Sequence, residues 1–276
     1  MPYWIIFLFL FAHTAAAQQT MDWQATQGDI IHVQIHADSD IQQLTALGKS
    51  WPFQKNIDGM THGWIGVDLQ QKIGNYPLQW HSEKNNYTEH LHVTKGEFRI
   101  SRITVEKNMS SFDAAALKRI RADQQAIKNT YDIKLDRFPL FSKASMPVDG
   151  IESTPFGAQR YVNGKARSPH SGIDIAAPEG SPIAAPLAGK VLLVEDMFLN
   201  GTLIAIGHGK GLVSIYAHLH KSHVKLGEQV SAGQVIAEVG STGRSTGPHL
   251  HWGMRFNHVR INPQSLLMLS DNTNKK

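Results

Sequence analysis

Between Gly189 and Phe256 the sequence repeats short apolar runs that are separated by glycine-containing turns. Runs of this length, bounded by turn residues, are typical of β-strands rather than of helices. They cover residues 189–194, 202–208, 212–218, 235–239 and 249–256. We therefore expect this part of the chain to be built from β-strands, with a helix only near residues 262–269.

Side chains that can bind a metal ion or transfer a proton lie within and before these strands. His170 and Asp174 are four residues apart, and the neighbouring proline and glycine argue against a helix. We place this pair on a loop that leads into a strand. His249 and His251 are two residues apart in a predicted strand, so both point to one face. Imidazole and carboxylate are ordinary zinc ligands, and a catalytic zinc ion keeps three protein ligands.

Residues 212–220 alternate between apolar and polar side chains. The pattern predicts an apolar face and a polar face that includes Ser214, Tyr216, His218 and His220. His218 is then expected to project from the sheet where a pocket can form. Tyr216, on the same side, is expected either to orient a substrate or to serve as an interior or rim aromatic.

Histidine spacing alone does not identify a metal site. A lone histidine on a strand is more often solvated or hydrogen-bonded than metal-bound. The chain repeats the His-x-His spacing at His90 and His92, and a looser version occurs at His32 and His36. We expect these four side chains to lie on the outer faces of strands, and an accessory metal site there is the less favoured alternative.

The order of the motifs from Met146 to Pro263 closely resembles the lysostaphin/LytM family of zinc metallopeptidases, endopeptidases that cut peptide bridges in bacterial cell wall. The motifs are His170-x-x-x-Asp174, Tyr216-x-His218 and His249-x-His251, with further landmarks at Phe156-Gly157, Gly180–Ile183, Gly227-Glu228 and Gly240–Gly243. The resemblance implies a LytM-like antiparallel β-sheet domain. It also implies one Zn²⁺ per chain, held by His170, Asp174 and His251, with His218 and His249 as the catalytic histidines.

In this family one catalytic histidine acts as general base and the other is thought to stabilise the tetrahedral intermediate. We assign His249 as the base, because it shares a strand face with His251, and His218 as a hydrogen-bond donor to the oxyanion. The reverse assignment stays open. The complete ligand set argues against a non-catalytic LytM-type activator of cell-wall amidases. Residues 223–237 also resemble lipoyl- and biotinyl-carrier domains, but the chain has no matching modified-lysine motif.

The first 17 residues form a short apolar run that ends in three alanines, as in a secretory signal peptide. This leader is too short to span a bilayer comfortably, although it lacks an early lysine or arginine, and an uncleaved anchor is the alternative. We therefore expect a periplasmic or secreted protein with no stable membrane insertion after cleavage.

Four further segments follow the leader. Residues 18–107 read as a small antiparallel β-sandwich, with strands at 29–36, 64–69, 87–93 and 97–105. Residues 108–145 form a linker whose helix, Ser111–Tyr131, is capped by Ser110 or Ser111. The peptidase-like segment covers 146–270, and a polar, disordered tail is expected at 271–276. The chain is thus expected to be mainly β.

Composition excludes several classes of function. The net charge is only +4, and no cluster of basic residues interleaved with aromatics is present, which argues against nucleic-acid binding. With no cysteine, a disulfide scaffold and a thiol nucleophile are both excluded. The expected partners are peptidoglycan peptides, and the sequence predicts no oligomeric state.

Overall fold

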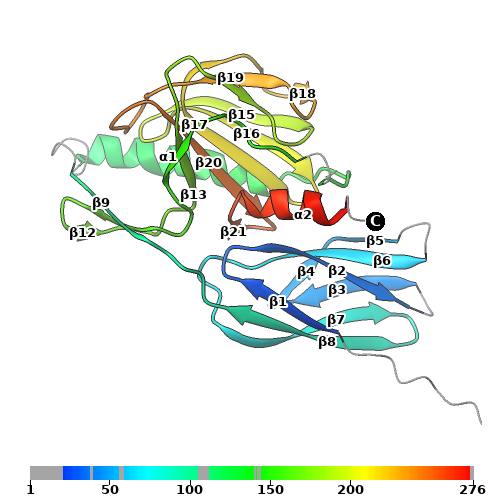
Figure 1. The fold of residues 1–276 in the computed structure, drawn as a ribbon. Helices are drawn as coiled ribbons and strands as arrows, with labels where there is room; N and C mark the ends of the chain where they lie inside the picture. The colour runs from blue at the N-terminus through cyan, green and yellow to red at the C-terminus, as the bar shows by residue number, and fades with distance from the viewer. Residues whose placement is uncertain are drawn as a thin grey trace, which may run out of the picture.

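The computed structural model describes residues 21–37, 40–55, 59–104, 112–139, 141 and 144–273. The leader predicted at residues 1–17 lies outside this range. The described part is mainly β, as expected, with two α-helices, α1 and α2 (Figure 1). Neither of these helices is long and apolar enough to cross a membrane.

The N-terminal part is a β-sandwich of two sheets (Figure 1). A five-stranded sheet has the order β1-β8-β7-β3-β4, and a three-stranded sheet has the order β2-β6-β5. Their strands are β1 (Asp22–Thr26), β2 (Ile30–His36), β3 (Ile41–Ala46), β4 (Lys49–Trp51), β5 (Phe53–Lys55), β6 (Met60–Gly66), β7 (Gly74–Ser82) and β8 (Asn86–Thr94). Alternate apolar residues such as Val33, Leu44, Trp80 and Leu91 fill the core between them.

Two details of this part differ from the sequence prediction. β1 pairs with β8 in parallel, so the sandwich is not purely antiparallel. The strand predicted at 97–105 is shorter, β9 (Ile100–Ile103), and it does not belong to the sandwich. It pairs in parallel with β11 (Gln159–Val162), which also pairs with β12 (Lys165–Ala166). Periodicity identifies a strand but not its partner, and this error follows from that limit.

Helix α1 (Ala114–Tyr131) lies against the second part of the chain (Figure 1). Its N-cap is Asp113, whose carboxylate accepts a 2.7 Å hydrogen bond from the Ala116 N–H group. The predicted serine caps are therefore wrong, and a carboxylate also suits the positive end of the helix dipole. Near its C-terminal end, Ile127 and Tyr131 pack on a buried cluster from the neighbouring sheet.

The C-terminal part is a ten-stranded sheet with the central order β10-β13-β20-β17-β16-β15-β18. All five strands predicted in it are present. The strands are β10 (Ile151–Thr154), β13 (Gly172–Ala176), β14 (Pro182–Ala184), β15 (Gly189–Met197), β16 (Gly201–Gly209), β17 (Leu212–Ser222), β18 (Gln229–Val230), β19 (Val235–Val239), β20 (His249–Phe256) and β21 (Val259–Ile261). Helix α2 (Ser265–Thr273) follows them and continues into the tail predicted from residue 271.

Strand β17 is buried on both faces, which differs from the predicted polar face. Tyr216 belongs to the main core, whereas Val213 and Ile215 belong to the cluster beneath α1. The Tyr216 hydroxyl is fully buried, 2.9 Å from Ser214 Oγ, which lies 2.7 Å from His208 Nε2. Tyr216 is therefore an interior aromatic, and the alternative role in orienting substrate is wrong.

The sandwich packs against the end of the large sheet at which β20 ends and β21 and α2 follow (Figure 1). Trp51 contacts Phe256 with ring centroids 5.4 Å apart. Arg260 Nη2 lies 2.6 Å from Asp68 Oδ1, and the Arg260 N–H group donates to Asp68 Oδ2. Buried residues of both parts form one continuous core.

Candidate metal centre and catalytic groove

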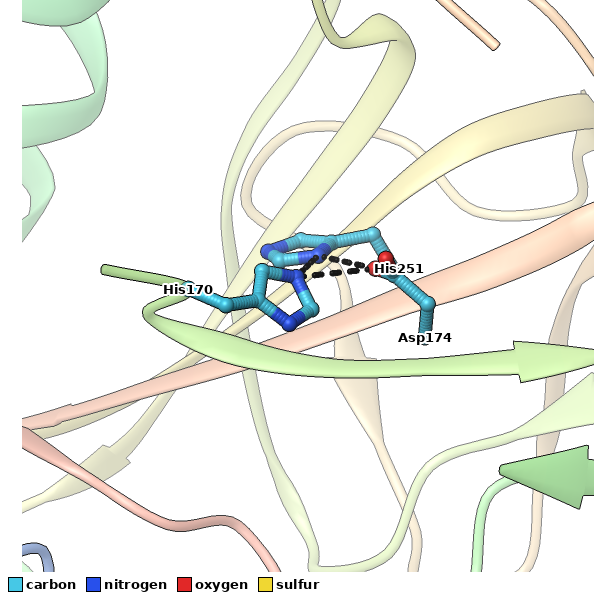
Figure 2. A group of neighbouring side chains, drawn as sticks. All are labelled: His170, Asp174 and His251. Carbon is cyan, nitrogen blue, oxygen red and sulfur yellow. Dashed lines mark hydrogen bonds and ion pairs between the residues drawn. The ribbon is translucent and has the colours of Figure 1, made fainter. Parts of the chain in front are cut away.

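His170, Asp174 and His251 meet where β13 and β20 pair (Figure 2). His170 lies just before β13, Asp174 lies within it, and Asp174 is the direct cross-strand partner of His251. The Asp174 Oδ1 atom is 3.0 Å from His170 Nε2 and 2.8 Å from His251 Nδ1. The two imidazole nitrogens are 3.0 Å apart. Among the described residues, this is the one group of three His, Cys, Asp or Glu side chains close enough to share an ion.

Burial and charge make this group suited to a cation. His170 and Asp174 are only 2% and 4% exposed. Burial alone raises the pKa of the Asp174 carboxyl, but hydrogen bonds from His170 and His251 outweigh it and hold this pKa well below its usual range. Burial lowers the pKa of His251. An ionised carboxylate therefore faces two imidazoles, and the three side chains form the donor set of a divalent metal site once the ion replaces the imidazole protons that face Asp174.

Backbone groups near the site orient the side chains of the proposed ligands. His170 Nδ1 lies 3.1 Å from the Pro155 carbonyl oxygen, which can only accept, so Nδ1 can keep its proton there while Nε2 binds a metal ion. Gly172 lies opposite Gly253 in the strand pairing. A Cβ atom on Gly172 would lie 2.4 Å from the Trp252 carbonyl oxygen and 2.9 Å from His251 Cε1. Glycine at this position leaves room for the His251 ring.

His218 and His249 face each other beside this group, with ring centroids 4.6 Å apart. His218 Nδ1 lies 2.8 Å from the Thr242 carbonyl oxygen, and His249 Nδ1 lies 2.9 Å from the Gly247 carbonyl oxygen. Both rings therefore donate from Nδ1 and leave Nε2 unprotonated in the neutral form. The His218 ring is also 6.4 Å from that of His251.

The backbone at His218 has a left-handed conformation, with a φ of 63°. This conformation is strained for a side chain of this size and is enriched at functional sites. The pairing of β17 shifts register beside it, and the His218 N–H group bonds to the Asn200 carbonyl oxygen at 2.8 Å. The irregularity turns His218 out of the buried strand. Burial then lowers its pKa to about 4.

A cavity of about 460 Å³ contains all five residues. Its wall includes residues 244–247 of the loop that precedes β20. All lining residues fall between Ser153 and His251, so the described part of the sandwich does not contribute to the wall. Arg160 and Arg244 also line it and were missed by the sequence analysis. Two sequence features could have pointed to these arginines. They are the Phe156-Gly157 landmark shortly before Arg160 and the polar loop that contains Arg244.

The four histidines of the N-terminal part that have similar spacing lie away from this cavity. His36, His90 and His92 are exposed on strands of the sandwich, as predicted. His32 differs, because its ring stacks on His62 at 5.0 Å and on Trp64 at 5.4 Å. None of them joins a group of three potential ligands among the described residues. Histidine pairs with the same spacing in the sequence therefore have different surroundings in the fold.

Comparisons with known proteins agree with this geometry. The model of peptidase family M23 matches residues 168–263. A DD-carboxypeptidase/endopeptidase, Mpg, of Neisseria meningitidis is 40% identical over 116 residues, which are 42% of this chain and 27% of that protein. The peptidoglycan DD-endopeptidase ShyC of Vibrio cholerae is 39% identical over 116 residues, 41% of this chain and 27% of that protein. The matched regions thus span about a quarter of these curated relatives.

A solved structure extends the similarity to nearly the whole chain. The crystal structure of a peptidase M23 protein from Pseudomonas aeruginosa superposes with a TM-score of 0.70 at 31% sequence identity. The match covers 88% of this chain and 94% of the other, so it includes the sandwich as well as the large sheet. The chain belongs to peptidase family M23.

Proposed function

We propose that this chain is a zinc-dependent endopeptidase that hydrolyses peptide cross-links or stem peptides of bacterial peptidoglycan. One observation carries the proposal. A buried His-Asp-His group and two histidines with unprotonated Nε2 atoms line the same groove. The name of the relative ShyC, a peptidoglycan DD-endopeptidase, supports peptidoglycan as the substrate class.

The types and spacing of the ligand atoms of His170, Asp174 and His251 suit a zinc ion. Tetrahedral ligands about 2.0–2.2 Å from a zinc ion lie roughly 3.3 Å from one another. The three ligand atoms of His170, Asp174 and His251 are 2.8–3.0 Å apart, so an outward movement of a few tenths of an ångström brings them to this spacing. Bound there, zinc supplies a Lewis acid that polarises the scissile carbonyl group and makes water a better nucleophile near neutral pH.

The tautomers of the two remaining histidines define what they can do. Neutral His218 and His249 offer lone pairs at Nε2, so both begin the reaction as acceptors. We propose that His249 takes the proton of the attacking water and that His218 orients this water by accepting its second hydrogen. The role first expected for His218, donation to an oxyanion, is the alternative and requires a proton at Nε2.

Incubation of the purified protein with muropeptides of known cross-link, followed by mass analysis, tests the proposal. Expected products are peptides shortened at one defined bond, with loss of activity in the presence of a chelator and recovery on adding zinc. His90→Ala serves as a control variant, because His90 shares the His-x-His spacing but is exposed on the sandwich. Intact muropeptides after incubation with the zinc-loaded protein would contradict the proposed activity.

A non-catalytic activator of cell-wall amidases is the alternative function. Such a protein has no need for the buried ligand group and the paired histidines together. The same assay separates the two functions when a purified amidase is added. An activator releases amidase products only when the amidase is present, whereas an endopeptidase acts alone.

The proposed substrate also places the protein outside the cytoplasmic membrane. We propose that residues 1–17 are the export signal and that the mature protein is periplasmic or secreted. Mass measurement of the protein recovered from the periplasm or the culture medium tests this. The expected mature chain begins at Gln18, and a chain that retains Met1 in a membrane fraction would contradict it.

A further inference from the structure

The turn between β15 and β16 forms part of the wall of the catalytic groove. It consists of Phe198, Leu199 and Asn200, and the last two line the 460 Å³ cavity. Its carbonyl groups accept two backbone hydrogen bonds from other parts of the groove. Asn200 accepts one of 2.8 Å from the His218 N–H group, and Leu199 accepts one of 2.9 Å from the Arg244 N–H group. The turn thus bonds directly to the backbone of a proposed catalytic histidine.

The backbone of His218 depends on such support. Its φ of 63° lies in the left-handed region, which a side chain of this size adopts only where the surrounding structure holds it there. The pairing of β17 with β16 shifts register between Tyr216 and Leu219, and within this shift the His218 N–H group bonds to Asn200. The Asn200 carbonyl group therefore helps to hold the conformation that turns His218 into the groove.

The start of β16 also contacts the loop that binds the His218 ring. A Cβ atom on Gly201 would lie 2.2 Å from Thr242 Oγ1, so the two segments are in direct contact. Thr242 Oγ1 accepts a 3.1 Å hydrogen bond from the Thr202 N–H group and donates one of 2.9 Å to the Leu219 carbonyl oxygen. The Thr242 carbonyl oxygen lies 2.8 Å from His218 Nδ1. A movement of the turn would therefore disturb both the backbone and the ring of His218.

Helix α1 holds the opposite side of this turn. Asp123 Oδ2 accepts a 2.8 Å hydrogen bond from the Phe198 N–H group. Arg119 Nη2 donates a 2.8 Å hydrogen bond to the Asp196 carbonyl oxygen and lies 3.6 Å from Asp196 Oδ2. The ring of Phe112, just before the helix, packs edge-on against the ring of Phe198 with centroids 5.5 Å apart. The turn is therefore fixed between α1 on one side and His218 on the other.

We propose that Asp123 and Arg119 of α1 are positioning residues for catalysis, because they hold the β15–β16 turn whose Asn200 carbonyl group supports His218. This role rests on the proposed function, in which His218 is catalytic. Neither Asp123 nor Arg119 lines the 460 Å³ cavity, so their effect on the reaction passes through the turn. The helix predicted as a linker is then also part of the functional unit of the peptidase domain.

Amide hydrogen exchange, followed by NMR on the full-length protein, tests this role without cleavage. Asp123→Ala removes the hydrogen bond to the turn but does not weaken α1, because alanine is the most favourable residue in a helix. The His218 N–H group should then exchange about threefold faster or more, the scale expected for one lost hydrogen bond. Adding Arg119→Ala should increase this rate further. The His170 N–H group, which forms its own backbone hydrogen bond away from β15 and β16, should keep its wild-type rate.

Cleavage of muropeptides by the zinc-loaded variants gives a second measurement. In Asp123→Ala, kcat should fall severalfold while KM stays near the wild-type value, because His218 is displaced and the rest of the groove is kept. Asp123→Asn keeps a side-chain oxygen that can accept the hydrogen bond, so it should restore most of the exchange protection and of kcat. Asp132→Ala is the matched control, because it makes the same substitution at an exposed acid that follows α1 and faces His258 instead of the turn. It should match the wild type in both measurements.

Two results would overturn the positioning role. One is an exchange rate of the His218 N–H group that is unchanged in Asp123→Ala or is raised equally in Asp132→Ala. The other is a rise in KM of Asp123→Ala with kcat unchanged. Absence of cleavage by the wild-type protein contradicts the proposed endopeptidase function instead, and the exchange rates are measured independently of it.

Discussion

Asp174 and His251 are cross-strand partners, and the 2.8 Å contact between Asp174 Oδ1 and His251 Nδ1 joins β13 to β20 within the candidate metal centre. His170 completes the group from the loop before β13. The two strands therefore fix two of the three proposed ligands directly through their register. A metal site built on paired strands is more rigid than one built on loops alone.

The first prediction concerns metal binding. His170→Ala, Asp174→Ala and His251→Ala should each lose zinc, because each variant removes one of three proposed ligands. The affinity should fall by more than the about 10–100-fold typical when an outer-shell partner of a ligand is removed. Elemental analysis of the dialysed proteins measures this, with His92→Ala as the control that keeps its zinc. Full zinc content in all three variants would refute the ligand assignment.

The second prediction separates catalysis from metal binding. His218→Ala and His249→Ala should retain zinc and the fold but lose activity on muropeptides by at least about a hundredfold, as expected for positioned acid/base groups. Their Nδ1 atoms bond to backbone carbonyl oxygens of the groove loop, and neither belongs to the group of three potential ligands. Wild-type rates in either variant, at unchanged zinc content, would exclude the assigned role of that histidine.

Local pattern was sufficient to predict the parts of the fold that depend on neighbouring residues. The five apolar runs formed strands, and His170 lies before a strand as predicted, whereas Asp174, which was predicted to lie on the same loop, lies within β13. Two-residue periodicity also put His249 and His251 on one strand, β20. Such features follow from alternation and turn residues within a few positions of each other.

Features that depend on distant contacts could not be predicted. Strand β17 is buried on both faces because Tyr216 lies in the main core and α1 covers Val213 and Ile215 on the other side, and the sequence of β17 contains no information about either partner. The left-handed backbone of His218 depends on the register of three strands. Arg160 of β11 and Arg244 of the loop before β20 come together from two segments about 80 residues apart. The short strands of the sandwich, such as β4 and β5, are too brief for a periodic signal.

The third prediction concerns pH and the buried histidine beneath Tyr216. Burial and, to a smaller extent, the charge of Arg137 outweigh a hydrogen bond to the Ala188 carbonyl oxygen and lower the pKa of His208 from 6.5 to about 4. Between these pKa values the unfolded chain binds more protons than the folded chain. Stability should therefore be fully present above pH 6.5 and be lost as the pH falls toward 4. The total loss is on the order of 3 kcal/mol, at about 1.4 kcal/mol per pKa unit.

Urea unfolding of the metal-free protein at pH 7 and pH 5 measures this effect. In His208→Asn the difference in unfolding free energy between the two pH values should be smaller than in the wild type by about 2 kcal/mol. His90→Asn is the control, because it makes the same substitution at an exposed histidine of the sandwich. Its pH dependence should match the wild type, and an unaltered pH dependence in His208→Asn would contradict the prediction.

The last prediction concerns the sandwich, which is proposed as a separate domain that is dispensable for chemistry. A chain that begins at Met146 keeps every residue lining the catalytic groove, so it should still bind one zinc ion. It also loses β9 and α1 and exposes Phe256, which Trp51 covers in the full chain, so its melting temperature should be several degrees lower. Replacing Trp51 by alanine in the full chain removes that aromatic contact alone and should cost about 3–5 kcal/mol without affecting zinc content. Loss of zinc from a folded truncated chain would show that the metal centre depends on the sandwich or on α1.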